Sequence, residues 1–295
     1  MNRKLKGNLI LLITAIIWGT SFVAQRVGVA ELEPSLFIGI RSIIGAVVLI
    51  PFIFIFSAKK LKDRFILKET VKSGLICGVI LCFASNFQTW GMVYESVTAG
   101  KAGFITALYM IFVPVVLIFF GKKLNIQTAS GVIIAVIGMY LLCMTEEKFS
   151  FGTGEFLVFA CAVFYTFHIL TIDNYSDTTD GVAMSCIQFA VCGIISLIYY
   201  LVAHGTPDKF ALTQNWLPLM YSGAMSCGIA YTLQIIGQKF ADPTPASIIM
   251  SLESVFAALG GWIILRENMS VVEVIGCIIM FAAIIIVQLP DRKKS

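Results

Sequence analysis

The stretch PTPASIIMSLESVFAALGGWIILRE, residues 243–267, decides how the rest of the chain is interpreted. Almost all of it is apolar. A helix from Pro243 to Leu265, rising about 1.5 Å per residue, would cross the roughly 30 Å hydrocarbon core of a bilayer. One carboxylate, that of Glu253, lies near the middle. Because an ionised glutamate in hydrocarbon is costly, we expect Glu253 to face the interior of a helix bundle or a hydrated cavity.

This stretch has a counterpart earlier in the chain, as do two other segments. The matches, at offsets of 144, 146 and 147 residues, are 107–110 (ALYM) with 251–254 (SLES), 88–94 with 234–240, and 18–22 (WGTSF) with 165–169 (YTFHI). Gly7 and Gly154 precede the last pair at the same spacing. The sequence therefore predicts two repeats of one membrane-spanning unit, residues 1–149 and residues 150–295.

Composition places the chain in a membrane. Hydrophobic residues make up 58% of it and charged residues 13%, against about 25% charged in a typical soluble protein, and the mean hydropathy is +0.91. The net charge of +4 is spread over segment ends, which is not the patch that binds nucleic acid. All eight cysteines fall in apolar segments without a C-x-x-C motif, so we expect packing residues rather than disulfides or a zinc site.

Apolar segments predict an all-α integral membrane protein with ten transmembrane helices. The expected spans are 8–26, 35–57, 71–94, 98–120, 126–144, 154–172, 181–203, 216–238, 243–265 and 271–289. The first could be a signal peptide, but it is long, lacks a small-residue cleavage site and belongs to the repeat, so we expect it to be retained.

The basic residues predict the orientation. With a cytoplasmic N-terminus, fifteen Lys and Arg residues fall inside and four outside, and both termini are cytoplasmic. The acidic inside loop Asp173–Asp180 opposes this bias. Since each repeat holds five helices, the second copy enters the membrane upside down. By analogy, inverted repeats around a site near the midplane are typical of alternating-access transporters.

In order and spacing, several elements resemble the drug/metabolite transporter superfamily, EamA type. They are WGTSF at 18–22, Phe37 and Arg41, AGFITALY at 102–109 with Pro114, and SLESVF at 251–256 with Arg266 and Glu267. The resemblance implies a ten-helix transporter of the bacterial inner (plasma) membrane, commonly an efflux system for amino acids, metabolites or drug-like compounds. It also implies a cavity lined by helices 1, 3, 4, 6, 8 and 9, with 5 and 10 peripheral. Two departures are Ser254, where the family often has proline, and Lys101, where it usually has a small or amide residue.

Four ionisable residues inside spans are candidates for substrate binding or coupling. Glu253 is suited to a substrate amine, a proton or a buried ion pair. Arg41 could extend outward toward Glu31 or Glu33, or pair within the bundle, and Lys101 could reach the interface or a ligand anion. His168 is either a hydrogen-bonded neutral histidine, or a proton relay or substrate contact.

Polar and aromatic residues complete the candidate site. Asn86, Gln88 and Thr89 recur as Thr232 and Gln234 in the second copy, and amides in hydrocarbon need partners. The aromatic and small polar candidates are Trp18, Ser21, Phe22, Phe104, Tyr109, Tyr165 and Tyr231.

No enzyme signature is present: the two histidines make no metal spacing, and there is no phosphate loop or nucleophile elbow. We therefore expect no cofactor and no catalytic residues. The predicted function is a secondary transporter of a small-molecule substrate in the lipid bilayer, with protons as a possible coupling ion. Facilitated diffusion, a lipid scramblase and an integral membrane enzyme stay open as alternatives, and the lack of a ring of charges disfavours a channel.

Overall fold

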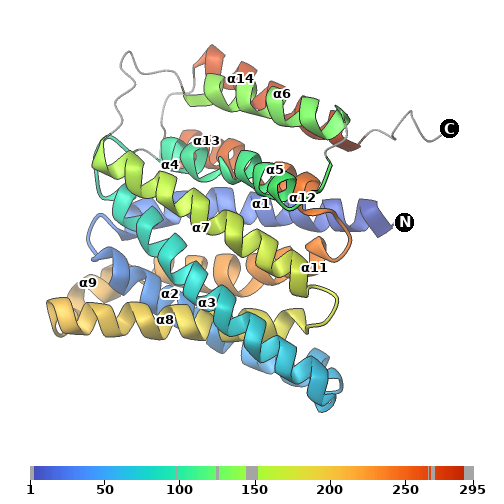
Figure 1. Ribbon diagram of the computed structural model, residues 1–295. Helices are drawn as coiled ribbons and strands as arrows, with labels where there is room; N and C mark the ends of the chain where they lie inside the picture. The colour runs from blue at the N-terminus through green and yellow to red at the C-terminus, as the bar shows by residue number, and fades with distance from the viewer. Residues whose placement is uncertain are drawn as a thin grey trace.

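A computed structural model describes residues 3–97, 99–123, 126–143, 152–264, 266 and 270–288. Regular secondary structure in this part of the chain is helical throughout, as predicted (Figure 1). Seven helical segments of it are long and apolar enough to cross a membrane: Arg3–Gly28, Pro34–Ser57, Ala99–Phe119, Thr153–Tyr175, Gly181–His204, Trp216–Gln238 and Pro243–Ile264. The chain is therefore a multi-pass membrane protein.

The elements follow one another in the same way in both halves. The first half holds α1 (Arg3–Gly28), α2 (Pro34–Phe52), η1 (Ile53–Ser57), η2 (Lys60–Lys62), α3 (Arg64–Met92), α4 (Ala99–Thr106), α5 (Tyr109–Phe119) and α6 (Ile126–Cys143). The second holds α7 (Thr153–Tyr175), α8 (Gly181–His204), α9 (Lys209–Gln214), α10 (Trp216–Met220), η3 (Tyr221–Ala230), α11 (Tyr231–Gln238), α12 (Pro243–Met250), α13 (Glu253–Ile264) and α14 (Val271–Gln288).

Carboxylates set where several helices begin. The Asp63 side chain accepts hydrogen bonds from the amides of Phe65 and Ile66, which satisfies donors at the start of α3. This cap explains why α3 begins at Arg64, seven residues before the predicted start at Val71. The prediction from hydropathy missed these residues because the first turns of α3 are polar and project beyond the apolar stretch.

Two of the predicted spans are broken helices. The span predicted over 98–120 is α4 followed by α5, and the span over 243–265 is α12 followed by α13. At the first break the Met110 amide bonds to Ala107 O, three residues back rather than four. At the second, the Ser254 amide bonds to Ser251 O in the same way. The two breaks lie in 107–110 and 251–254, the segments that match each other at the 144-residue offset.

The packing of the helices follows the duplication. α1 lies against η3 and α11, and its counterpart α7 lies against α3; α1 also packs on α13, as α7 does on α4. Single contacts match too. A Cβ added at Gly7 would lie 2.7 Å from Phe240 Cβ, and one at Gly154 would lie 2.9 Å from Tyr94 Cβ. Both glycines thus permit the same close approach, at the offsets read from the sequence.

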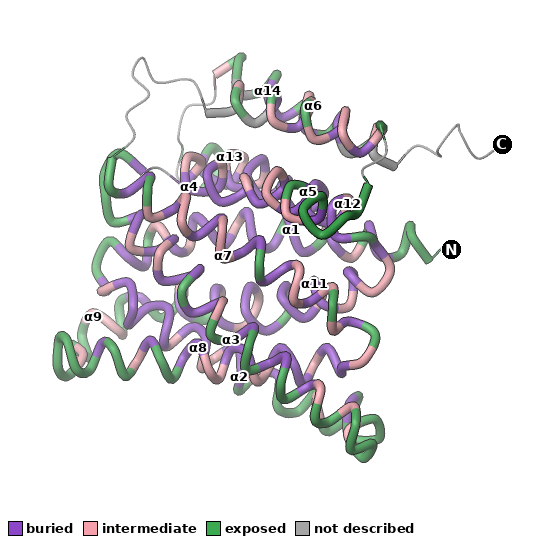
Figure 2. The backbone as a smooth tube through the Cα atoms, in the orientation of Figure 1, coloured by how far each residue is buried: buried purple, intermediate pink, exposed green. Residues whose placement is uncertain are grey.

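Burial separates the centre of the molecule from its periphery. Half of α1 and almost all of α12 are buried, whereas the outward faces of α3 and α8 are exposed (Figure 2). α6 packs along α14 at one edge of the bundle (Figure 1). Exposed side chains there and elsewhere include large apolar ones such as Phe119 and Val202, 86% and 84% exposed, as expected of faces that contact lipid.

Candidate functional site

A small cavity lies among the central helices. The side chains that line it are Trp18, Phe22, Gln25, Arg41, Gln88, Thr106, Tyr109, Tyr165, Ile169, Ser226, Tyr231, Gln234 and Glu253. Its free volume is about 20 Å³, enough for about one or two water molecules. Apart from Arg41 on α2, the lining comes from the predicted helices 1, 3, 4, 6, 8 and 9, the set that the family resemblance implies.

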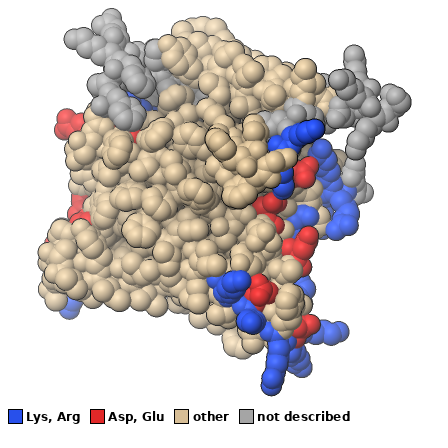
Figure 3. Space-filling view, in the orientation of Figure 1, with Lys and Arg blue, Asp and Glu red and all other residues tan. Residues whose placement is uncertain are grey.

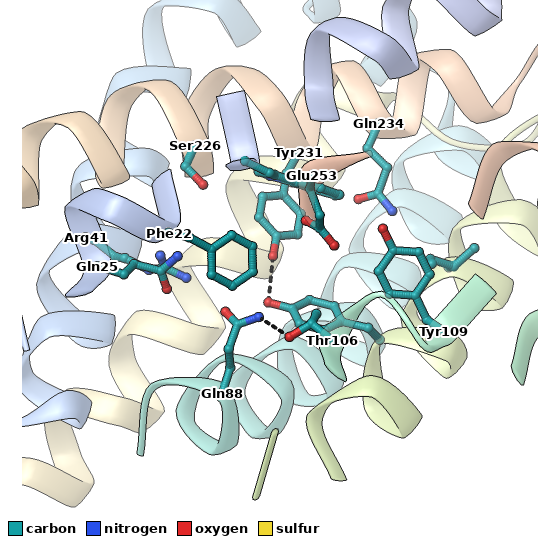
Figure 4. Close-up of a pocket in the computed structure, with 13 residues that line it drawn as sticks. Phe22, Gln25, Arg41, Gln88, Thr106, Tyr109, Ser226, Tyr231, Gln234 and Glu253 are labelled. Carbon is teal, nitrogen blue, oxygen red and sulfur yellow. Dashed lines mark hydrogen bonds between the residues drawn. The ribbon is translucent and has the colours of Figure 1, made fainter. Parts of the chain in front are cut away.

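Four pairs of lining residues occupy equivalent places in the two copies. They are Trp18 with Tyr165, Phe22 with Ile169, Gln88 with Gln234, and Tyr109 with Glu253. Arg41 and Gln25 lie at one end of the cavity in Figure 4, and Tyr109 and Gln234 lie at the other, with Glu253 beside Tyr231. The cavity therefore sits between the two copies, with chemically different ends.

Some lining groups bond to one another across helices. Gln88 Nε2 donates to Thr106 Oγ1 at 2.9 Å, which joins α3 to α4. The hydroxyls of Tyr165 and Tyr231 lie 2.9 Å apart and link α7 to α11 (Figure 4). Each of these bonds joins two helices of the same copy, one in the first and one in the second.

Other lining groups keep unused hydrogen-bonding atoms. Among the described residues, no partner is found for Trp18 Nε1, Gln25 Oε1, Arg41 Nε and Nη1, Tyr109 OH, Gln234 Oε1 or Glu253 Oε1. An unpaired buried polar group costs about 1–3 kcal/mol, and one that persists calls for an explanation. Six such residues around one cavity mark a place where a polar molecule can bind.

Arg41 is the most unusual of them. Its side chain is 2% exposed, and its guanidinium carbon lies 5.9 Å from the centre of the Phe37 ring. Within the described ranges no carboxylate lies within 4 Å of it. The side chain does not extend outward to the acidic residues named above, because Glu33 caps α2 and Glu31 accepts from Asn215. Arg41 thus stays inside the bundle, but within the described ranges it has no carboxylate partner of the kind that pairing in the bundle would require.

Lys101 lies outside the cavity. Its Nζ is 2.6 Å from Glu155 Oε1 and 3.1 Å from Ser96 O. The pair joins the start of α4 to the start of α7, and the Glu155 side chain is 2% exposed. The expectation that Lys101 contacts a ligand anion is therefore not supported, since the lysine already has a carboxylate.

Five further candidates are not among the lining residues. His168 bonds through Nε2 to Gln188 Oε1 at 3.0 Å and packs edge-on against Tyr231. Asn86 donates to Cys82 O and to Ser196 Oγ, both at 2.8 Å, so it ties α3 to α8. The remaining three are Thr89, which bonds to Ser85 O within its own helix, the buried Ser21, and Phe104, which packs against the core.

Four lining residues were not among the candidates predicted from sequence: Gln25, Thr106, Ile169 and Ser226. Gln25 carried a usable signal, since it is an amide in an apolar helix and follows Phe22 and Trp18 at spacings of three and seven on one face. Ser226 gave none, because it lies in η3, a π-helical segment. A helix wheel of 3.6 residues per turn misplaces side chains there.

Tyr109 and Glu253 are the first residues of α5 and α13. The positive end of each half-helix dipole is therefore close to the cavity, which favours negative charge there. Broken helices with their ends at a central site are a known device of membrane transporters.

The seven cysteines whose side chains the structure describes are free thiols.

Known proteins match the chain over nearly its whole length. A transporter of Archaeoglobus fulgidus named as uncharacterized is 28% identical over 97% of this chain and 87% of its own. The uncharacterized transporter YoaV of Bacillus subtilis is 24% identical over 93% of this chain and 94% of its own. A crystal structure of another protein superposes with a TM-score of 0.80 at 17% identity, covering 98% of this chain and 99% of that one.

The family comparison matches the chain twice. The model of the EamA-like transporter family fits residues 5–144 and again residues 152–289. The two fits divide the chain almost where the internal offsets do, and between them they cover the helices that line the cavity. The chain therefore belongs to the EamA-like transporter family.

Proposed function

We propose that the protein is a secondary transporter that moves a small polar metabolite across the plasma membrane by alternating access. The observation that carries this is the central cavity, lined by equivalent residues of both copies and holding unpartnered polar atoms. Substrate sites of inverted-repeat transporters lie at the interface of the repeats. A free volume of about 20 Å³ cannot hold a metabolite, so binding requires the helices to separate.

The proposed membrane arrangement has ten crossings and two inverted copies. α3, α6 and α14 supply the three crossings beyond the seven segments named above. Both termini would be cytoplasmic and transport would run outward. The distribution of basic residues supports this arrangement, because Lys and Arg gather at the end of the molecule where the chain begins (Figure 3).

The two ends of the cavity suggest different roles. Arg41 would bind an anionic group of the substrate, since its planar guanidinium can make paired hydrogen bonds to a carboxylate or phosphate. Glu253 would carry the coupling proton or bind a substrate amine, because within the described ranges no cationic side chain lies within 4 Å of its carboxylate. Trp18 and Phe22 would form the apolar wall.

Glu253→Gln tests the coupling role, because it keeps the size of the side chain but cannot ionise. In proteoliposomes, exchange of substrate down its gradient should continue, while acceleration by an imposed proton gradient should be lost. Loss of both would assign Glu253 to the substrate amine. Wild-type rates in both assays would overturn the coupling role of Glu253, because the proton would then act through another group. A wild-type protein that no proton gradient accelerates would leave facilitated diffusion. Glu95→Gln, at an exposed glutamate in a turn, is the matched control.

A further inference from the structure

A second hollow lies outside the central cavity, between α2, α8 and the η3–α11 segment. Its free volume is about 550 Å³, within the usual range of roughly 300–1,000 Å³ for ligand pockets. Most of its wall is apolar, formed by Val48, Leu49, Phe52, Phe56, Val182, Ile229, Leu233, Ile236 and Phe240. Ser57, Lys60, Asp180 and Lys239 add polar and charged groups. We refer to this hollow as the α2–α11 groove.

The first copy of the repeat fills the equivalent place. At the 146-residue offset, Ile229, Leu233 and Ile236 correspond to Phe83, Phe87 and Trp90. Those three form an aromatic cluster in which the Phe83 and Phe87 rings lie 6.2 Å apart, and Phe87 and Trp90 6.0 Å apart. Trp90 also packs at 5.6 Å on Tyr199, which corresponds to Phe52 of the groove at an offset of 147. Aromatic rings thus fill this place in the first copy, whereas the smaller branched aliphatic side chains of the second copy leave the groove open.

The charged end of the groove has an excess of positive charge. The Asp180 carboxylate is already engaged, because Oδ1 accepts from Ser57 Oγ and from the Ala183 amide at the start of α8. Lys60 Nζ lies 3.7 Å from Asp180 Oδ2, and its side chain is 63% exposed.

Lys239 is the second lysine at this end, and its Nζ donates to Thr179 O at 3.0 Å. Burial and the nearby charge of Lys60 lower the pKa of Lys239, although Asp180 and Asp177 partly offset this. An anion placed between the two lysines would relieve their repulsion.

We propose that the α2–α11 groove binds one phospholipid with an anionic headgroup. An acyl chain would lie along Ile229, Leu233 and Ile236, and the headgroup phosphate would contact Lys60 and Lys239. Basic residues next to an apolar groove at the membrane surface are the chemistry that anionic lipids recognise. A zwitterionic lipid would fit the apolar wall equally well but would gain less from the two lysines.

The groove shares a helix with the central cavity. Ile229, Leu233 and Ile236 face the groove, while Tyr231 and Gln234, on the same segment, line the cavity. A lipid seated in the groove would therefore press on the segment that carries part of the cavity wall. Occupancy of the groove is expected to alter the stability of the whole protein as well as the groove itself.

The test is native mass spectrometry of the full-length protein in neutral detergent with added phosphatidylglycerol or phosphatidylcholine of identical chains. One phosphatidylglycerol should remain bound preferentially. Replacing Ile229, Leu233 and Ile236 by Phe, Phe and Trp, the residues of the first copy, should abolish that binding with both lysines intact. Lys60→Gln and Lys239→Gln should each weaken the preference roughly fivefold.

Further variants and a competitor distinguish binding of lipid in the groove from general contact of the protein surface with lipid. Leu233→Phe alone serves if the triple variant fails to fold, and Ile278→Phe, at a 62% exposed position on α14, should leave binding unchanged. Glycerol phosphate, which has no acyl chain, should not displace the lipid. Equal binding of both lipids, unchanged binding by the filled variants, or displacement by glycerol phosphate would each overturn the proposal.

Discussion

Arg41 is a buried cation that the described part of the fold does not neutralise. An unpaired polar group in a protein interior costs about 1–3 kcal/mol, and a charge costs more. We therefore predict that Arg41→Met raises the thermal unfolding midpoint in detergent while it abolishes substrate binding. Arg41→Lys should retain part of the binding, because the positive charge remains but lysine cannot make the paired hydrogen bonds of a planar guanidinium. A less stable Met variant would show that Arg41 holds the bundle together instead.

Lys101 and Glu155 make an ion pair whose loss should affect stability rather than affinity. Breaking a buried pair costs about 3–5 kcal/mol because one charge is stranded, and the lower end applies here since the Lys101 side chain is 16% exposed. We expect Lys101→Gln and Glu155→Gln each to lower the unfolding midpoint, and the double variant to recover part of the loss. A double-mutant cycle in detergent measures this. A fall in substrate affinity with unchanged stability would return Lys101 to the candidate site.

At the scale of elements, the broken helix α12–α13 positions Glu253, and α1 packs against it. A Cβ added at Gly19 would lie 2.3 Å from Phe256 Cβ and 2.7 Å from Glu253 O. Gly19→Ala must therefore push α13 away, and we expect it to destabilise the protein by about 1–3 kcal/mol and to impair transport. Gly100→Ala, with nothing within 4 Å, is the matched control and should change stability by less than about 1 kcal/mol. Equal behaviour of the two variants would contradict the close packing of α1 on α13.

The segment η3 is a longer π-helical element, and comparison of the two copies accounts for it. Gly78 packs on Val191 as Gly223 packs on Ile44, and these two glycines are 145 residues apart. Beyond η3, Gln88 and Gln234 are 146 apart. The segment 223–234 of the second copy therefore has one residue more than the segment 78–88 of the first. A π-helix, with its wider turn, accommodates such an insertion.

At the scale of the whole molecule, the proposed mechanism depends on how the two copies are oriented in the membrane. A reporter fused after Ser295 should be cytoplasmic, and one inserted near Pro207 should lie outside, because basic residues concentrate on the side of the N-terminus. Accessibility of single cysteines at these points to a membrane-impermeant reagent checks the result. A C-terminus found outside would contradict ten crossings and the inverted arrangement together.

The membrane class, the internal matches and many of the cavity-lining residues could be predicted from the amino-acid sequence. Hydropathy identifies apolar spans because each backbone group in lipid must be satisfied within its own helix. The offsets of 144, 146 and 147 residues also paired Trp18 with Tyr165, Phe22 with Ile169, Gln88 with Gln234 and Tyr109 with Glu253, and all eight residues line the cavity. A repeat with two-fold related packing places equivalent residues about one axis.

The contacts of each polar side chain could not be predicted without the three-dimensional packing of the helices. Asn86 and Gln88 are near neighbours on α3, yet one bonds to Ser196 of α8 and the other lines the cavity. Lys101 forms an ion pair with Glu155, which lies 54 residues further along the chain and was not a candidate from sequence. A helical period specifies the face on which a residue lies, but the partner on that face depends on how neighbouring helices are rotated and spaced. Those rotations follow from close packing among many side chains at once, which no local pattern encodes.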